Sequence, residues 1–311
     1  MPGSRWGPSC AAQESGYPSM TSSELSIWIG ASMGVNLQPQ PAGQAHGGSI
    51  NTCYRWESDV GPLFVKVAAV ERRAMLEAEA VGLEELRRAA AVRVPRVLGV
   101  GAHGSQAWLA LEWIQLGART GPAEALLGEL LASQHRCTAP EFGWYRNNTI
   151  GSTAQLNDWM GDWVEFWRER RLRYQLELAA LKGHDGRLLR RGEVLLERLD
   201  GFFTTYRPVP SLLHGDLWGG NWGVESGGGP VIFDPAVYYG DREADLAMTR
   251  LFGGFGERFY AAYGASFPLD AGWRIRTDLY NLYHVLNHLN LFGAGYSGQA
   301  LALLERLLAE L

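Results

Sequence analysis

Two aspartates and an asparagine in the second half of the chain have a spacing that suits phosphoryl transfer. Asp216 and Asn221 are five positions apart, and Asp234 lies thirteen positions further on, at the end of the apolar run 231–233. In kinase sites with this pattern, the first Asp orients the attacking hydroxyl, and the Asn and second Asp hold Mg²⁺ on the nucleotide phosphates. The pattern predicts Asp216 as the catalytic residue, Asn221 and Asp234 as metal ligands, and ATP and Mg²⁺ as cofactors.

The residues between Asn221 and Asp234 indicate how these two side chains meet. The sequence Gly-Gly-Gly-Pro at 227–230 is typical of a turn joining two strands. A hairpin there would bring Asp234 back beside Asn221. Asp, Asn and Gly are also common in ordinary loops. Identities fixed at these spacings seldom arise by chance, so we favour the catalytic interpretation.

Phosphate-binding groups are predicted in the first third of the chain. Lys66 interrupts the apolar strand 63–67, where its ammonium group must reach water or bind an anion. A turn containing Gly47, Gly48 and Ser49 precedes this strand, and its backbone N–H groups would be able to approach phosphates. Two glycines in a hairpin also make a bare turn, and the GxGxxG spacing of protein kinases is absent.

A helix is predicted over 71–91, and it carries a carboxylate suited to hold Lys66. Glu79 lies thirteen positions after Lys66, and in active kinases a helix Glu pairs with the strand Lys. Glu77, Glu84 and Glu85 are competing partners on the same helix.

Further strands are predicted at 97–100 and 107–114, and a mainly helical region begins near 123. We expect Glu112, Trp113 and Ile114 to form the hinge whose backbone binds adenine. The predicted fold is α+β, with a small antiparallel β lobe and a larger, mainly helical lobe. The expected boundaries are 1–20 for a mobile tail, 21–116 for the nucleotide-binding lobe and 117–311 for the catalytic and substrate lobe.

Three features of the helical region have both structural and functional interpretations. Trp159, Trp163 and Trp167 recur every four residues, which favours the buried face of one helix. His288 follows His284 by four positions, a spacing that suits a metal, but no Glu or Cys completes a site, so a pocket-lining His288 is preferred. Asp245 can cap the helix that it opens or brace the backbone of the catalytic loop.

Composition limits the class of protein. The 311 residues, 46% hydrophobic and 20% charged, are typical of a globular chain of one large domain or two lobes. A net charge of −5 gives no broad attraction for nucleic acid. We find no apolar run that suits a membrane span and no secretory signal. Three widely spaced cysteines indicate a reducing compartment. We therefore expect a cytoplasmic protein that binds neither nucleic acid nor membranes.

The chain resembles the fructosamine kinase (ketosamine-3-kinase) family, a branch of the protein-kinase-like superfamily, over about residues 22–308. The resemblance rests on the stretch 214–221, which reads His-Gly-Asp-Leu-Trp-Gly-Gly-Asn, on Phe-Asp-Pro-Ala at 233–236, and on the runs 241–248 and 251–255. It also rests on Asn148, Thr149, Ile150, Gly151, Gln155, Asn157, Trp159, Trp163, Phe166, Arg171, Leu172, Gln175 and Leu176.

The resemblance implies ATP-dependent phosphorylation of the 3-hydroxyl of ketoamines, the adducts that sugars form with amines, including protein lysines. The 3-phosphate is unstable and sheds the sugar, so the resemblance also implies deglycation. It implies small ketoamines or glycated proteins as partners. Trp218 would form a wall of the sugar pocket or pack under the loop. Family members often carry a cysteine in the Gly-rich loop that links dimers, but this chain has Ser49 there, so we expect a monomer or weak dimer.

Two other functions are compatible with parts of this pattern. A kinase acting on an aminoglycoside, choline or a similar alcohol would share the phosphate-binding residues, because a fold does not fix its substrate. A nucleotide-binding pseudokinase scaffold would share the fold, but Lys66, Asp216, Asn221 and Asp234 are all present and argue against it.

Overall fold

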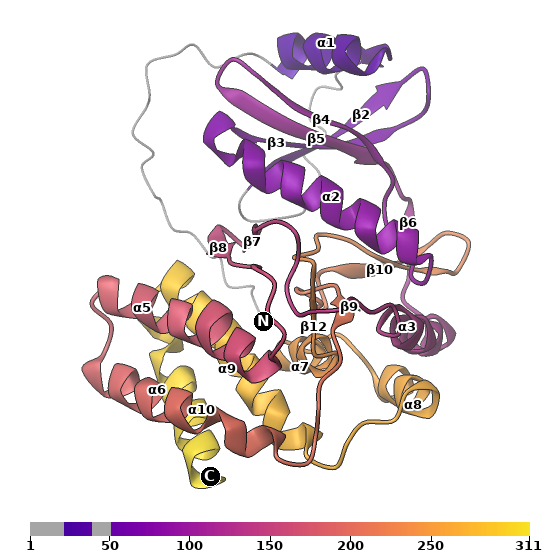
Figure 1. Ribbon diagram of the computed structural model, residues 1–311. Helices are drawn as coiled ribbons and strands as arrows, with labels where there is room; N and C mark the ends of the chain where they lie inside the picture. Colours follow the sequence, from indigo (N-terminus) through magenta and orange to yellow (C-terminus); the bar gives the residue numbers. More distant parts are fainter. Residues whose placement is uncertain (1–21, 39–50) are drawn as a thin grey trace, which may run out of the picture.

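A computed structural model of the chain describes residues 22–38 and 51–311 (Figure 1). The chain first builds an antiparallel five-stranded sheet with the strand order β1-β2-β3-β5-β4. Its strands are β1 (Leu37–Gln38), β2 (Thr52–Ser58), β3 (Leu63–Ala69), β4 (Val97–His103) and β5 (Gln106–Glu112). The turns before β3 and β5 contain Gly61 and Gly104, with φ of 104° and 54°. Glycine adopts these angles without the strain that a Cβ would cause.

One helix covers each face of this sheet. Successive side chains of β5 point to opposite faces, so they contribute to two different cores. Leu109 and Leu111 belong to the core under α2 (Arg73–Ala89), which follows the short 3₁₀ helix η1 (Val70–Arg72). Trp108 and Ala110 belong to a second core under α1 (Ser22–Met33). The core under α2 continues into the rest of the molecule, so α2 lies between the sheet and the helical part (Figure 1).

The rest of the chain is mainly helical. Its helices are α3 (Gly121–Gln134), α4 (Trp163–Trp167), the π-helical η2 (Arg168–Arg173), α5 (Tyr174–Leu181), α6 (Gly186–Arg198), η3 (Leu199–Phe203), α7 (Glu243–Leu251), α8 (Glu257–Ser266), α9 (Trp273–Phe292), η4 (Ala294–Tyr296) and α10 (Ser297–Ala309). Among the described helices, the 20-residue helix α9 has the largest number of buried residues, twelve. It packs against α5, α7 and α10 and forms the support on which the cleft described below is built.

Short strands connect these helices and carry the polar sequence motifs. One sheet has the order β11 (Pro230–Ile232), β10 (Trp222–Glu225), β6 (Leu116–Gly117). A second pairs β12 (Tyr238–Gly240) with β9 (Ser211–Leu213), and a third pairs β7 (Asn148–Ile150) with β8 (Thr153–Gln155). The predicted α+β class, with a small antiparallel sheet and a larger helical part, is therefore confirmed. Both residues of β6, which flank the predicted boundary at 116, pair with β10.

One helix prediction is wrong. Trp159 does not lie on the same helix as Trp163 and Trp167, because α4 begins at Trp163. The side chain of Asp162 accepts a hydrogen bond from the N–H of Glu165 and caps the helix at that point. Trp159 lies in the preceding loop and is 40% exposed, whereas Trp163 and Trp167 are buried as expected. The predicted tail 1–20 and the predicted turn at Gly47, Gly48 and Ser49 lie outside the described residues.

A buried ion pair fastens α9 to α7. Both side chains are only 2% exposed, and Nε and Nη2 of Arg276 donate to the two carboxylate oxygens of Glu243 at 2.7 and 3.0 Å. The arginine also donates from Nη2 to Asp270 at 2.9 Å. A bidentate ion pair of this kind fixes the relative orientation of the two helices.

Replacing Arg276 with Met is expected to lower the free energy of unfolding by about 3–5 kcal/mol, because Glu243 would stay buried without its partner. Arg306→Met is the matched control, since Arg306 pairs with Asp278 at 3.0 Å but is 56% exposed, and such pairs contribute about 0–1 kcal/mol. Urea unfolding of both variants measures the difference. Equal losses in the two variants would show that the buried pair has no special role.

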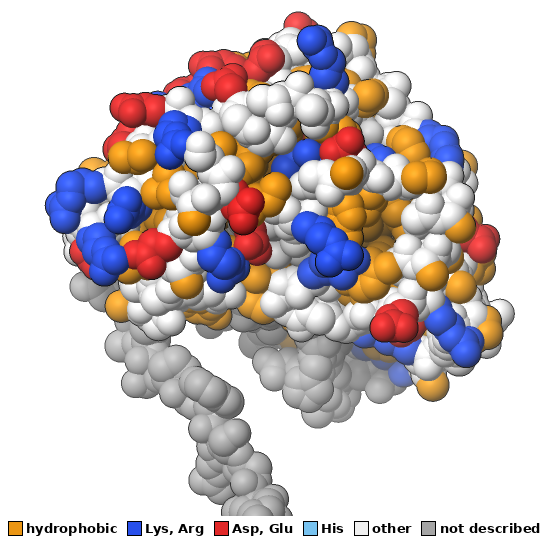
Figure 2. Space-filling model, turned by 90° about the horizontal axis from the view of Figure 1, so that it is seen from below, with side chains coloured by type: hydrophobic (Ala, Val, Ile, Leu, Met, Phe, Trp, Pro, Cys, Tyr) orange, Lys and Arg blue, Asp and Glu red, His pale blue; other side chains and the backbone are white. Residues whose placement is uncertain are grey.

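The charged side chains on one face of the molecule are mixed in sign. The face shown in Figure 2 carries acidic and basic side chains in mixed groups rather than a continuous basic area. A continuous basic area is what binding to a nucleic-acid backbone requires. Within 22–38 and 51–311, no helix combines the length and apolar character needed to cross a bilayer.

Candidate active site

The loop between β9 and β10 carries Asp216 and Asn221, and it is tightly packed. Gly215 has a φ of 83°, and a Cβ on it would lie 2.0 Å from the carbonyl oxygen of Ala236. A residue larger than glycine would therefore force the loop away from the segment that follows β11. The amide of Asn221 donates to the backbone carbonyl of Asp216 at 2.9 Å and to its carboxylate at 3.3 Å.

The hairpin predicted from the Gly-Gly-Gly-Pro sequence is confirmed. In the β10–β11 pair, Trp222 lies opposite Ile232, and the N–H of Phe233 then donates to the carbonyl of Asn221 at 3.1 Å. This register places Asp234 beside the loop, with its backbone carbonyl 3.4 Å from the Asn221 amide. Asp234 has a φ of 58°, unusual for a residue other than glycine.

Lys66 joins the sheet to this loop. It extends from β3, is 4% exposed, and places Nζ 2.7 Å from Glu79 and 2.6 Å from Asp234. Burial alone would lower the pKa of Lys66, but the two carboxylates outweigh it and hold the pKa above its ordinary value. Glu79, rather than Glu77, Glu84 or Glu85, is the residue of α2 that contacts Lys66. The ammonium is thus charged and positioned at neutral pH.

Asp216 lies in a poorly hydrated environment near the carboxylate of Asp234. Burial, together with the nearby charge of Asp234, raises the pKa of its carboxyl to about 7. A carboxylate with a pKa near neutral is better matched to proton transfer than an ordinary aspartate.

Two buried residues support the backbone around Asp216. The carboxylate of Asp245, 1% exposed, accepts from the N–H groups of His214 and Gly215 at 2.7 and 2.8 Å, so it braces the loop from inside α7. The imidazole Nε2 of His214 donates to the carbonyl of Phe233 at 3.0 Å, which leaves Nδ1 to accept from the N–H of Asp216 at 3.3 Å. His214 therefore ties the loop that carries Asp216 to the segment that follows β11.

A single cleft of about 1050 Å³ lies between the sheet and the helical part. All but one of the predicted site residues that the structure describes line this cleft. The lining residues among them are Lys66, Glu79, Glu112, Trp113, Ile114, Asp216, Trp218, Asn221, Asp234 and His288. Asp245 is the exception, since it lies behind the loop.

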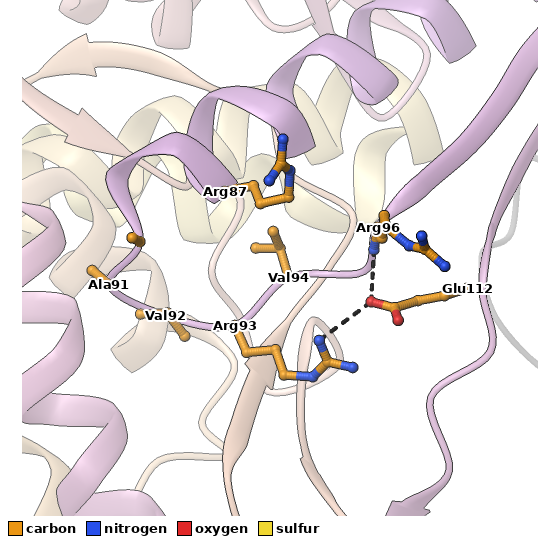
Figure 3. Close-up of a pocket in the computed structure, with 8 residues that line it drawn as sticks. Arg87, Ala91, Val92, Arg93, Val94, Arg96 and Glu112 are labelled. Carbon is orange, nitrogen blue, oxygen red and sulfur yellow. Dashed lines mark hydrogen bonds and ion pairs between the residues drawn. The ribbon is translucent and has the colours of Figure 1, made fainter.

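The hinge residues have different surroundings. The Glu112 carboxylate accepts from the N–H of Arg96 at 2.8 Å and pairs with Arg93 at 3.3 Å (Figure 3). The N–H of Trp113 donates to Pro62 at 3.3 Å. Within the described ranges, neither the N–H nor the carbonyl of Ile114 has a hydrogen-bond partner in the protein. Of the three predicted hinge residues, Ile114 is therefore the one whose backbone N–H and carbonyl are both available to a ligand.

Aromatic rings form the other end of the cleft. Trp218 and Phe252 are 40% and 42% exposed, and their rings lie 6.5 Å apart. The ring of His288 lies 4.9 Å from that of Phe252. Its Nδ1 contacts the backbone carbonyl of His284 at 2.8 Å. A carbonyl only accepts, so Nδ1 carries the proton. Because burial lowers the pKa of His288, the ring is neutral and Nε2 is a hydrogen-bond acceptor.

The sequence did not point to several cleft residues. Asn148 and Thr149 of β7, and Phe252 after α7, line the cleft. Arg119, which also lines it, contacts the catalytic loop. Asn148, Thr149 and Phe252 belong to the residues that carry the family resemblance. Nothing in the sequence pattern indicated Arg119, because a single Arg in a connecting segment is usually a solvated surface residue.

Residues 21–310 match the profile of the fructosamine kinase family. The chain is 40% identical over 281 residues to a probable ketoamine kinase of Synechocystis, covering 90% of this chain and 94% of the relative. It is 40% identical over 291 residues to a chloroplastic protein-ribulosamine 3-kinase of Arabidopsis thaliana, covering 92% and 88%. A crystal structure from Thermobifida fusca, provisionally named a fructosamine-3-kinase, superposes with a TM-score of 0.80 at 33% identity, covering 92% and 98%. The chain therefore belongs to the fructosamine kinase family and has its two-lobed, kinase-like fold.

Proposed function

We propose that this protein transfers the γ-phosphoryl group of ATP to the 3-hydroxyl of ketoamines, and that it acts in deglycation because the 3-phosphate sheds its sugar. One observation carries the proposal. Asp216, Asn221 and Asp234 meet in a single cleft, and Lys66 faces them from the sheet at 2.6 Å from Asp234. Positioning and charge are what phosphoryl transfer needs most from a protein.

In this proposal Asp216 receives the proton of the 3-hydroxyl. The 3-oxygen forms its bond to the γ-phosphorus while the bond from that phosphorus to the bridging oxygen breaks, and ADP leaves with the electron pair. The burial that raises the pKa of Asp216 to about 7 makes the carboxylate a competent acceptor at neutral pH.

Asn221 and Asp234 fit a magnesium ion. The Asn221 amide nitrogen faces Asp216, so its carbonyl oxygen is left for another ligand, and Asp234 adds a carboxylate that is 34% exposed. Mg²⁺ prefers oxygen ligands and takes most of them from phosphates and water. The described residues contain no cluster of three His, Cys, Asp or Glu side chains that would hold a metal by itself. The ion would neutralise phosphate charge when bound.

The remaining cleft residues divide between nucleotide and acceptor. Lys66, held by Glu79, would bind the α- and β-phosphates, and the backbone of Ile114 would pair with adenine. Trp218, Phe252 and His288 would surround the ketoamine. The acceptor Nε2 of His288 would receive an N–H or O–H group of that substrate.

Replacing His288 with Phe is expected to lower kcat/KM for the ketoamine about 5- to 30-fold, while KM for ATP stays unchanged. The substitution keeps an aromatic ring beside Phe252 but removes the acceptor, and one hydrogen bond of this kind contributes about 1–2 kcal/mol. Steady-state kinetics with each substrate varied in turn measures the effect. An unchanged kcat/KM for the ketoamine would remove His288 from substrate binding.

The substrate proposal is tested with a panel of acceptors. ADP release with Mg-ATP is measured for ribulosamine, fructosamine, an aminoglycoside and choline. Mass spectrometry then determines the mass of each product. We expect a phosphorylated sugar–amine adduct with one or both ketoamines. Phosphorylation of the aminoglycoside or choline alone would favour the other kinase function, and no stimulation by any alcohol would favour a pseudokinase. The cytoplasmic location and the monomer or weak dimer stay predictions.

A further inference from the structure

Arg119 contacts the loop that carries Asp216 and Asn221. It lies in the short connection between β6 and α3, and its Nη2 donates to the backbone carbonyls of both Gly219 and Trp222, the latter at 2.6 Å. Its guanidinium lies over the indole ring of Trp222, 4.3 Å from the ring centroid. In the sequence, Gly219 and Trp222 lie on either side of Asn221.

The segment 219–222 needs contacts that fix its backbone conformation. Gly219 and Gly220 precede Asn221, and glycine allows the backbone many conformations. From the other side, Gly219 packs closely against Gly253, since a Cβ on it would lie 2.8 Å from the Gly253 carbonyl oxygen. The indole N–H of Trp222 donates to the carbonyl of Gly254 at 3.1 Å. Arg119 thus holds the loop from one side, and residues 253–254 contact it from the other.

We infer that Arg119 is a positioning residue that holds the amide oxygen of Asn221 in place for the metal–nucleotide complex; this rests on the proposed function. Arg119 acts through the loop backbone and not through the phosphates. An arginine suits the task better than a lysine, because its planar guanidinium directs two hydrogens from one nitrogen and stacks on an aromatic ring at the same time. Groups that orient metal ligands from behind typically change metal affinity 10- to 100-fold when they are removed.

The chain offers a matched control in Arg136. Its guanidinium also donates to two backbone carbonyls, those of Ala132 and Ser266, and lies 4.7 Å from the centroid of the Phe267 ring. Like Arg119, it is an exposed residue. It does not line the cleft, so its replacement reports the cost of losing such a contact anywhere on the surface.

The test measures binding of a non-hydrolysable ATP analogue by calorimetry, with saturating Mg²⁺ and with EDTA, for the wild type, Arg119→Met, Arg119→Lys and Arg136→Met. We expect Arg119→Met to lose about 10- to 100-fold in affinity with Mg²⁺ and nothing with EDTA. Arg119→Lys should recover part of the loss, and Arg136→Met should match the wild type. Thermal unfolding confirms that each variant is folded.

Other outcomes overturn the inference in distinguishable ways. An equal loss with Mg²⁺ and with EDTA would mean that Arg119 contacts the nucleotide directly. The same change in Arg136→Met would mean a general loss of stability. A wild-type protein whose nucleotide affinity does not depend on Mg²⁺ would refute the metal assignment of Asn221 itself, and with it the role of Arg119.

Discussion

Replacing Asp216 with Asn is expected to lower turnover about 10²- to 10⁴-fold, the range for a positioned acid–base group. Asn has almost the same shape and can still hydrogen-bond within the loop, but it cannot accept the proton of the substrate hydroxyl. In the proposed function the nucleotide contacts belong to other residues, so the affinity for an ATP analogue should stay near the wild-type value. Single-turnover phosphorylation of a ketoamine and calorimetry with the analogue measure the two quantities.

A matched control for this variant is Asp278→Asn. Asp278 is a surface carboxylate paired with Arg306 and lies outside the cleft. Its loss should leave turnover unchanged. If Asp216→Asn retained turnover within a few-fold of the wild type, Asp216 would not be the proton acceptor.

The pKa of Asp216 also predicts how activity depends on pH. Its folded-state value of about 7 is raised by burial and by Asp234, and only the ionised form accepts a proton. The value of kcat/KM should therefore fall as pH decreases below about 7. A rate that is flat down to pH 5 would contradict this assignment.

Replacing Asp234 with Asn is expected to lower turnover by at least about 10²-fold, because a metal ligand contributes several kcal/mol of charge stabilisation in the transition state. The variant should also lose most of the gain in nucleotide affinity that Mg²⁺ provides. Lys66 would keep its ion pair with Glu79 at 2.7 Å, so a general collapse of the site is not expected. Titration of nucleotide affinity against Mg²⁺ checks the assignment.

Glu79→Gln is the informative comparison for Asp234→Asn. It removes the other partner of Lys66 and leaves the contact of Lys66 with Asp234 at 2.6 Å. This variant should weaken nucleotide binding with or without Mg²⁺, because Glu79 positions the lysine and not the ion. If both variants had the same dependence on Mg²⁺, Asp234 would act only as an ion-pair partner of Lys66.

Much of the site could be predicted because its residues are fixed by local sequence. The Gly-Gly-Gly-Pro turn forces a hairpin, and the hairpin alone brings Asp234 back to Asn221. A lysine in an apolar strand must reach water or bind an anion, and the kinase pattern selected Glu79 as its partner. The second partner, Asp234, was not predicted. The hairpin inference needed only strand pairing, whereas the pairing of Lys66 with Glu79 also needed the kinase pattern.

The errors and omissions came from contacts that a periodic pattern does not record. Trp159 shares the spacing of its helical neighbours, but Asp162 caps the helix three residues later. Arg119 has no local signal at all, since its role depends on carbonyls that are a hundred residues away in sequence. The protonation of His288 depends on one backbone carbonyl, which only the folded helix reveals.

The most direct test of the account is to determine where the phosphate is placed. The protein is incubated with Mg-ATP and a ribulosamine, the product is trapped before the sugar is shed, and NMR locates the phosphorus. The account predicts phosphate on the 3-oxygen, formed by the wild type and at least about a hundred times more slowly by Asp216→Asn. Phosphate on another oxygen, or equal rates for the two proteins, would contradict it.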